Sequence, residues 1–146
     1  MFELKLRLID KPNGMFSAGT VEIHSHDYIA RSGVDEMIFP YIPTLLNGLM
    51  SLLQNPHIQT CSFPMFMSSF DFSLKWRYTK PQTISFFHKG KMINEHTTEE
   101  VVNAVRNETS RFVNLHSNNM NFDIEYESVK LEIFDSVTAF EQFTYL

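Results

Sequence analysis

Two histidines in the stretch VEIHSHDYIARSG, residues 21–33, have the types and the spacing of metal ligands. Side chains alternate along a strand, so His24 and His26 would project from the same face. Val21 and Ile23 would project from the opposite, more apolar face, and the histidines are therefore expected to face solvent. A catalytic zinc site needs at least three protein ligands, and no other histidine has a companion motif. We expect no metal site and no cofactor.

Nucleophilic chemistry is also poorly supported by the sequence. Cys61 is the only cysteine, and it precedes a segment rich in Phe and Met. A free cysteine in such surroundings usually behaves as a small buried hydrophobic residue. The sequence has no G-x-S-x-G, Walker or G-x-G-x-x-G motif. We assign no catalytic residue and expect the chain not to be an enzyme.

The net charge of −5 is unevenly distributed. Residues 121–146 contain six acids and a single cation, Lys130. This asymmetry favours a surface that binds a basic protein partner, since complementary charge speeds encounter and imposes specificity. A solvated helix face without a partner is the alternative interpretation. The predicted partner-binding residues are Asp123, Glu125, Glu127, Glu132 and Asp135.

A basic stretch lies between residues 75 and 91, where aromatic residues are interleaved with five cations. Bases of RNA can stack on such aromatic side chains. Alternation, however, places Trp76 and Tyr78 on the same side as Phe70, which is expected to be core. The mild acidity of the whole chain also opposes strong nucleic-acid binding. The five cations are Lys75, Arg77, Lys80, Lys89 and Lys91.

The first half of the chain predicts two strands and a helix. Residues 2–8 alternate apolar and charged side chains, as a half-buried strand does. DKPNG, residues 10–14, has turn chemistry, and a second strand is expected over 16–29. A helix is expected to start at residues 32–35, with a kink or a restart near Pro43. Asn55-Pro56 is expected to end this helix. Its apolar stripe is typical of a buried helix face and consists of Leu45, Leu46, Leu49, Leu52 and Leu53.

The second half predicts strands followed by two helices. Residues 70–78 alternate strictly, and residues 83–95 indicate a hairpin that turns near HKGK. Thr97 and Glu100 form a capping box before an apolar stripe that runs to Leu115. The last segment, 126–140, fits a helical face over its whole length and a strand over a few residues, and its length favours a helix.

This order of elements predicts an α+β fold, with one antiparallel sheet of about four to six strands packed by two or three helices. The 146 residues contain no repeat or linker and are expected to form a single domain, residues 1–146. No segment has the length and apolarity of a membrane span, and the N-terminus has no signal-peptide pattern. The lone cysteine suits a reducing compartment. We expect a cytoplasmic location.

The chain resembles the small immunity proteins of bacterial toxin systems, including contact-dependent inhibition. The resemblance is carried by the initial hairpin and by TLLNGLMSLL (44–53), SSFDFSLKW (68–76) and TTEEVVNAVRNETSRFV (97–113). It implies a non-enzymatic cytoplasmic protein that neutralises a cognate toxin by covering its active cleft. No site residue of the family is carried over.

Two other functions stay open. One is a small enzyme or ligand-binding domain whose site is assembled from residues distant in sequence, and a deep polar pocket containing His24 or His26 would support it. The other is a nucleic-acid-associated regulator that uses the basic strands. The two functions can be distinguished by which charged segment forms a continuous exposed patch. A basic patch would favour this regulator, and an acidic patch would favour a protein-binding function.

The expected absence of a metal site is directly testable. The purified protein should contain no stoichiometric zinc or iron, because two adjacent histidines are too few ligands for a zinc site. Elemental analysis of the protein checks this. About one metal ion per chain, lost in the His24→Ala/His26→Ala double variant, would contradict the prediction.

Overall fold

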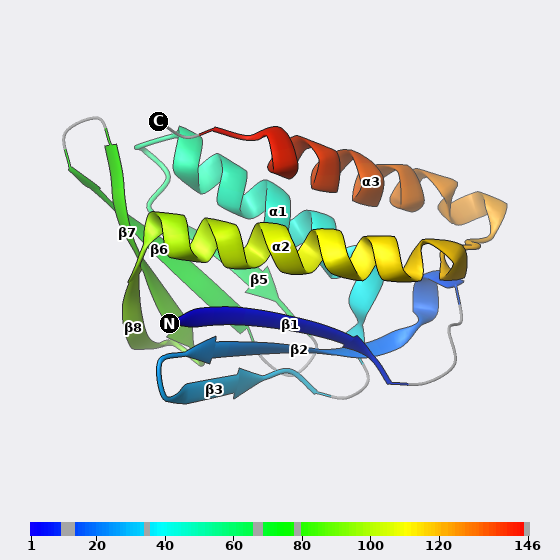
Figure 1. The fold of residues 1–146 in the computed structure, drawn as a ribbon, viewed down its shortest axis with the longest axis horizontal. Coiled ribbons are helices and arrows are strands. Elements are labelled where there is room, and N and C mark those ends of the chain that lie inside the picture. Colours follow the sequence, from blue (N-terminus) through cyan, green and yellow to red (C-terminus); the bar gives the residue numbers. More distant parts are fainter. Residues whose placement is uncertain (10–13, 34–35, 66–68, 78–79, 145–146) are drawn as a thin grey trace.

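The computed structural model describes residues 1–9, 14–33, 36–65, 69–77 and 80–144. In these ranges the chain forms two antiparallel sheets of four strands each and three α-helices. The helices lie together on one side of the molecule, and α2 runs beside β1 (Figure 1). The predicted α+β class is confirmed. The strands are divided between two sheets, where the sequence had suggested one.

The first sheet contains the N-terminal hairpin and has the strand order β1-β2-β3, with β4 paired to the start of β2. The predicted strand over 16–29 is interrupted, because β2 ends at Ser25 and a two-residue turn follows. In this turn His26 has a φ of 51°, in the left-handed region. Residues 10–13 of the predicted turn DKPNG lie outside the described residues, and Gly14, its last residue, has a φ of 54°. The strands are β1 (Phe2–Leu8), β2 (Ala18–Ser25), β3 (Tyr28–Arg31) and β4 (Glu36–Met37).

The second sheet has the order β5-β6-β7-β8. The predicted hairpin turn is confirmed at Lys89 and Gly90, whose φ angles of 54° and 78° are those of a tight type I′ turn. The short strand β5 was not predicted. The strands are β5 (Thr60–Pro64), β6 (Ser69–Arg77), β7 (Lys80–His88) and β8 (Lys91–Thr97).

Strand β6 has the predicted alternation. Phe70, Phe72 and Leu74 face the core and are buried. The register with β7 shifts between Lys75 and Trp76, and Trp76 is only half-buried. This irregularity in the pairing explains why Trp76, near the end of the strand, is less buried than the inward-facing residues before it.

Helix α1 (Ile38–Gln54) begins later than predicted. Ser32 does not cap it, because its hydroxyl accepts a hydrogen bond from the Val21 amide at 2.8 Å. The helix continues through Pro43 without the expected restart. It ends before Asn55, as predicted, and its five-leucine stripe is buried.

The other two helices follow the sequence prediction closely. Thr97 caps α2 (Thr98–His116) by accepting a hydrogen bond from the Glu100 amide at 3.2 Å. Leu115, expected on the buried face of α2, is 63% exposed. The C-terminal segment is a helix, α3 (Glu127–Gln142), preceded by the short 3-10 helix η3 (Ile124–Tyr126). No helix in the described ranges is long and apolar enough to span a bilayer.

The burial of β6 generates a stability prediction. Phe72→Ala should lower the free energy of unfolding by about 3–5 kcal/mol, because a fully buried ring is removed and a cavity is left. Ser73→Ala, on the opposite face of the strand, should cost at most about 1 kcal/mol. Urea denaturation of both variants is the measurement. A cost below about 1 kcal/mol for Phe72→Ala would mean that the register of β6 is wrong.

Candidate functional site

The two histidines with metal-ligand spacing do not share a face. His24 lies on the outer face of β2, is half-buried and contacts the carboxylate of Glu22. His26 leaves the strand at the turn, and its ring centroid lies 4.6 Å from that of His96. The expectation that both histidines project together toward solvent is therefore wrong, because β2 ends between them. Within the described ranges, no cluster of three or more His, Cys, Asp or Glu side chains could hold a metal ion.

A buried polar cluster joins the two sheets at this point. The Ser25 hydroxyl lies 2.6 Å from His96 Nε2, and Asn94 Nδ2 donates to the Ser25 carbonyl at 2.8 Å. His96 Nδ1 lies 3.7 Å from Glu100 Oε1. The order hydroxyl, imidazole, carboxylate is that of a hydrolase triad. Ser25 is fully buried and His96 is 3% exposed, so a substrate cannot reach the hydroxyl, and the cluster ties β2 to β8.

The sequence contains a signal for this cluster. Ser25 shares the inward parity of Val21 and Ile23, and a polar residue on a buried face requires a hydrogen-bond partner. His96, in β8, and Glu100, in the first turn of α2, are four residues apart across the start of that helix. The partner of Ser25 is 71 positions away, so only the folded chain identifies it.

Buried histidines in this protein resist protonation. Burial is the main cause that lowers the pKa of His96, and the positive charges of His26 and the Met1 amino group add to it, while Glu100 acts in the opposite direction. Burial also lowers the pKa of His88, whose Nδ1 lies 2.8 Å from the Tyr28 hydroxyl. The neutral imidazole is thus the favoured form of both side chains in the folded protein.

Cys61 does not have the properties of a nucleophile. Burial, together with the nearby negative charge of Asp71, raises the pKa of its thiol to about 12. The reactive thiolate is therefore scarce at neutral pH. The thiol lies near Gly48 of α1, in the layer where α1 packs on β5. These surroundings fit the packing role that the sequence suggested.

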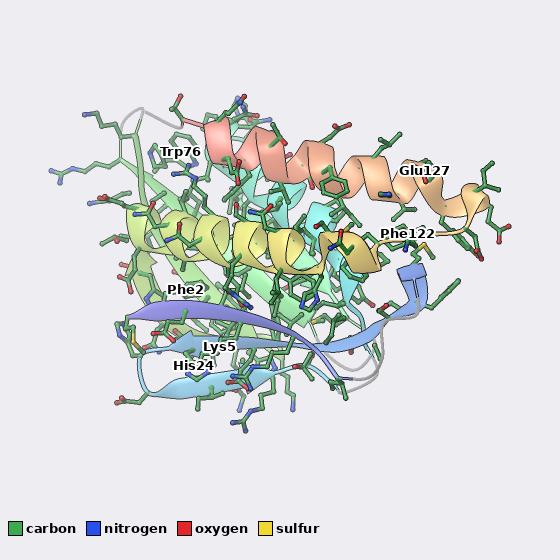
Figure 2. The ribbon with its side chains drawn as sticks, turned by 45° about the vertical axis from the view of Figure 1, so that its right-hand side comes forward. Phe2, Lys5, His24, Trp76, Phe122 and Glu127 are labelled. Atoms are coloured by element: carbon green, nitrogen blue, oxygen red, sulfur yellow. The ribbon has the colours of Figure 1, made fainter. Side chains whose placement is uncertain are left out.

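The predicted partner-binding acids are all exposed, and we call the part of η3 and α3 that carries them the α3 acidic surface: Asp123, Glu125, Glu127, Glu132 and Asp135. Asp123 precedes η3, Glu125 lies within it and Glu127 is the first residue of α3. Figure 2 marks Glu127 near the start of α3 and Phe122 in the segment that leads to it. None of the five forms an ion pair with a described residue. With Lys130 as the single cation of residues 121–146, the segment keeps a net negative charge.

Glu132 and Asp135 border a hollow between α1 and α3. It has a volume of about 430 Å³, and Asn47 lines it from the α1 side. Helix α1 contains no charged residue, and Thr44, Asn47 and Ser51 are exposed on it. The two acids therefore flank an uncharged helical face, which the sequence alone did not indicate.

The basic residues, in contrast, lie at two separate places. Arg77 and Lys80 face each other at one end of the β6–β7 pair, while Lys89 and Lys91 lie at the other end of β7. Strand β7 has nine residues, which corresponds to roughly 25–30 Å. Lys75 is paired with Glu95 at 2.7 Å. The cations of this stretch are thus divided between the two ends of β7.

Comparisons with known proteins give no relative. No family model, no curated protein and no solved structure matches this chain. The choice among the functions considered from the sequence therefore depends on where its charged and polar side chains lie.

Acidification should destabilise the protein before its carboxylates titrate. The pKa values of His96 and His88 lie below the ordinary 6.5 in the folded chain. The unfolded chain therefore binds protons that the folded chain does not as the pH falls below about 6.5, and stability falls with it. Urea unfolding between about pH 7.5 and 5.5 should show this decrease, at a slope of up to about 1.4 kcal/mol per pH unit for each histidine.

His96→Gln isolates the contribution of the buried cluster. A glutamine amide cannot titrate, so the slope of stability against pH should be smaller in this variant than in the wild type. His57→Gln removes an exposed imidazole and serves as the matched control. Equal slopes of stability against pH for the wild type and His96→Gln would contradict the assignment of a lowered pKa to His96.

Proposed function

We propose that this chain is a non-enzymatic protein-binding domain that captures a basic protein partner through the α3 acidic surface. The observation that carries the proposal is the set of five exposed carboxylates, which have no ion-pair partner among the described residues. From Glu127 to Asp135 the helix rises by about 12 Å. Several unit charges of one sign are thus concentrated at one end and along one side of the molecule.

Such a surface attracts a basic partner from a distance. Charge complementarity raises association rates by one to three orders of magnitude and repels partners of the same sign. It also opposes binding of a nucleic-acid backbone, whose phosphates carry the same charge. The cations on the second sheet are separated and do not form one patch, which also disfavours binding of a nucleic acid. We therefore favour a protein partner over a nucleic acid.

Apolar side chains within the acidic surface provide binding energy that charge alone does not. Ile124 is 94% exposed between Asp123 and Glu125, and Leu131 is 56% exposed on α3. Full burial of one such side chain is worth about 1.5–3 kcal/mol. A binding surface with an uncharged centre and a polar rim is typical of protein interfaces. Ile124, Leu131 and the uncharged face of α1 would form such a centre.

Within this class we propose an immunity protein that acts in the cytoplasm. An enzyme that cleaves nucleic acid must present a basic cleft to hold phosphates, and an acidic protein can occupy that cleft. The sequence resemblance to immunity proteins supports this choice. An enzyme built around His24 or His26 is less well supported, because neither lines the hollow between α1 and α3 or the hollows beside β1.

Charge neutralisation tests the proposal. The protein is used to recover its partner from the native host, and association rates are then measured against ionic strength. Replacement of the five acids by Asn or Gln should slow association and remove most of its salt dependence, because the steering field is lost while shape is kept. Salt screens the same field, since the Debye length falls from about 10 Å at 0.1 M to about 3 Å at 1 M.

A control variant separates the surface from the total charge. Glu3→Gln/Asp27→Asn/Glu99→Gln removes three exposed acids that lie outside η3 and α3, and it should have a much smaller effect on the rate. Co-expression with the recovered partner tests neutralisation itself, because growth should be rescued by the wild type and not by the five-acid variant. Equal rates and equal salt dependence for wild type and variant would place the binding face elsewhere.

A further inference from the structure

The turn that carries Ile124 is fixed to the body of the protein on both sides. Two positions before Ile124, the ring of Phe122 is buried, with its centroid 5.7 Å from that of Phe39 in α1. Two positions after it, the ring of Tyr126 packs edge-on against Phe16 at 5.3 Å. Ile124 itself is 94% exposed, more than any other large hydrophobic residue that the structure describes. Because the turn is preformed, a partner that covers Ile124 loses little binding energy to ordering the chain.

Negative charge flanks this apolar side chain. Asp123 and Glu125 are its neighbours in the chain and are exposed, and Glu127 follows at the start of α3. The Tyr126 amide donates to the Asp123 carbonyl at 2.8 Å and closes the turn between them. An apolar surface laid over Ile124 would therefore meet carboxylates at its border, and charge complementarity requires cations there.

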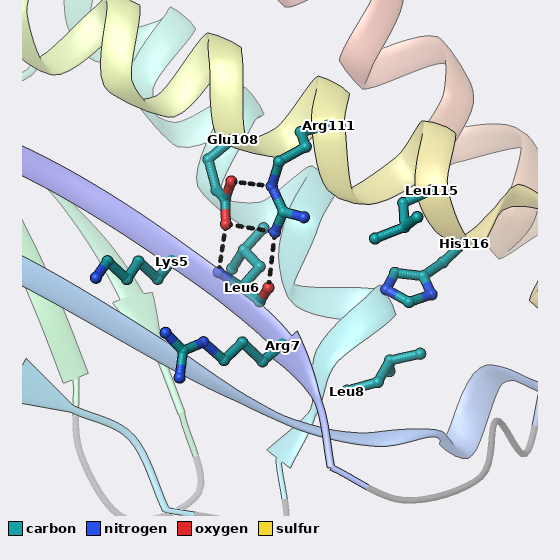
Figure 3. Close-up of a pocket in the computed structure, with 8 residues that line it drawn as sticks. All are labelled: Lys5, Leu6, Arg7, Leu8, Glu108, Arg111, Leu115 and His116. Carbon is teal, nitrogen blue, oxygen red and sulfur yellow. Dashed lines mark hydrogen bonds and ion pairs between the residues drawn. The ribbon is translucent and has the colours of Figure 1, made fainter.

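Leu115 has a similar exposure in opposite surroundings. It is 63% exposed near the end of α2. It borders a hollow of about 560 Å³ that is also lined by Lys5, Arg7 and Arg111 (Figure 3). The charge beside this leucine is thus mainly positive, and the charge beside Ile124 is negative. The two residues form a matched pair that separates exposure of an apolar side chain from the sign of the charge around it.

The charged groups next to Leu115 already have a role in the fold. Helix α2 lies along the edge of β1, where the Leu6 amide donates to Glu108 Oε2 at 2.7 Å and Arg111 Nη2 donates to the Leu6 carbonyl at 3.2 Å (Figure 3). Arg111 also donates to Glu108 through Nε at 2.6 Å and Nη2 at 2.9 Å. These bonds hold the helix on the sheet. Asp123 and Glu125 have no comparable ion pair with a described residue.

We propose that Ile124 is the anchor through which the α3 acidic surface holds an amphipathic helix of its basic partner. This inference rests on the proposed function and deepens it. Ile124 enters the hole between four apolar side chains of that helix, as a knob does in coiled-coil packing. Lys or Arg residues along the borders of the apolar face lie opposite Asp123 and Glu125. The acids speed association, and Ile124 slows dissociation, because long-range charge acts mainly on the first rate and buried contacts act mainly on the second.

Two synthetic peptides of about fourteen residues serve as probes, both with Leu at helical spacing. One has Lys at the remaining positions and the other has Glu. Fluorescence anisotropy should show that the wild-type protein binds the Lys peptide at least about tenfold more tightly than the Glu peptide. The amide resonances of Ile124 and Glu125 should shift on titration with the Lys peptide, and that of Leu115 should not.

Variants assign the contact to one side chain. Ile124→Ala should weaken binding of the Lys peptide about tenfold at both about 0.1 M and about 1 M salt, because salt does not screen an apolar contact. Leu115→Ala, the matched control, should change binding by less than about twofold. The five-acid variant should weaken binding at the lower salt concentration and have little effect at the higher one, where the charges are already screened.

The outcomes distinguish this inference from the proposed function. If the five-acid variant weakens binding of the Lys peptide and Ile124→Ala does not, Ile124 is not the anchor, while the acidic surface remains the binding face. Equal effects of Ile124→Ala and Leu115→Ala, or no binding of the Lys peptide up to about 1 mM, also overturn the inference. Capture of a basic partner fails separately, if the five-acid variant associates with the recovered partner as fast as the wild type.

Discussion

The arrangement of the whole molecule depends on the contact that Phe2 makes between the two sheets. Its ring packs edge-on against Phe72 and Phe86, each at a centroid distance of 6.2 Å, and against His96 at 5.1 Å. Apolar packing has little directionality, and the hydrogen bonds of Ser25 next to it fix the orientation. Because α2 begins directly after β8, this junction also determines where α2 meets the edge of β1. The hydrogen bonds of Glu108 and Arg111 to the Leu6 backbone are thus a consequence of how the sheets are joined.

The sequence predicted those elements whose signals are periodic and local. The alternation in β6, the capping box at Thr97 and the apolar face of α3 are signals of this kind. The division into two sheets was not predictable, because it depends on contacts such as Phe2 with Phe86. Strand β5 has five residues, too few for a clear period. The break after Ser25 was missed because a histidine in the left-handed region is a weak turn signal.

The candidate sites differ in how much of each could be predicted. Charged residues are almost always exposed unless paired, so the acids of α3 could be placed at the surface from the sequence. Their lack of ion-pair partners and the hollow beside Asn47 required the structure. Glu108 and Arg111 have the i,i+3 spacing of a helix pair. Their contact with Leu6 spans more than 100 positions, and no local pattern contains it.

The two surfaces also differ in what the fold gains from them. Glu108 and Arg111 satisfy backbone groups of an edge strand, so packing and protection of the edge explain their presence. The acids of α3 do neither, because the helix is held by Ile133, Val137 and Phe140 on its opposite side. A concentration of unpaired like charge destabilises a compact chain by self-repulsion. Glu127, in the first turn of α3, stabilises the helix dipole, whereas Glu132 and Asp135 lie farther along the helix and are the charges for which the proposed capture of a basic partner offers a role.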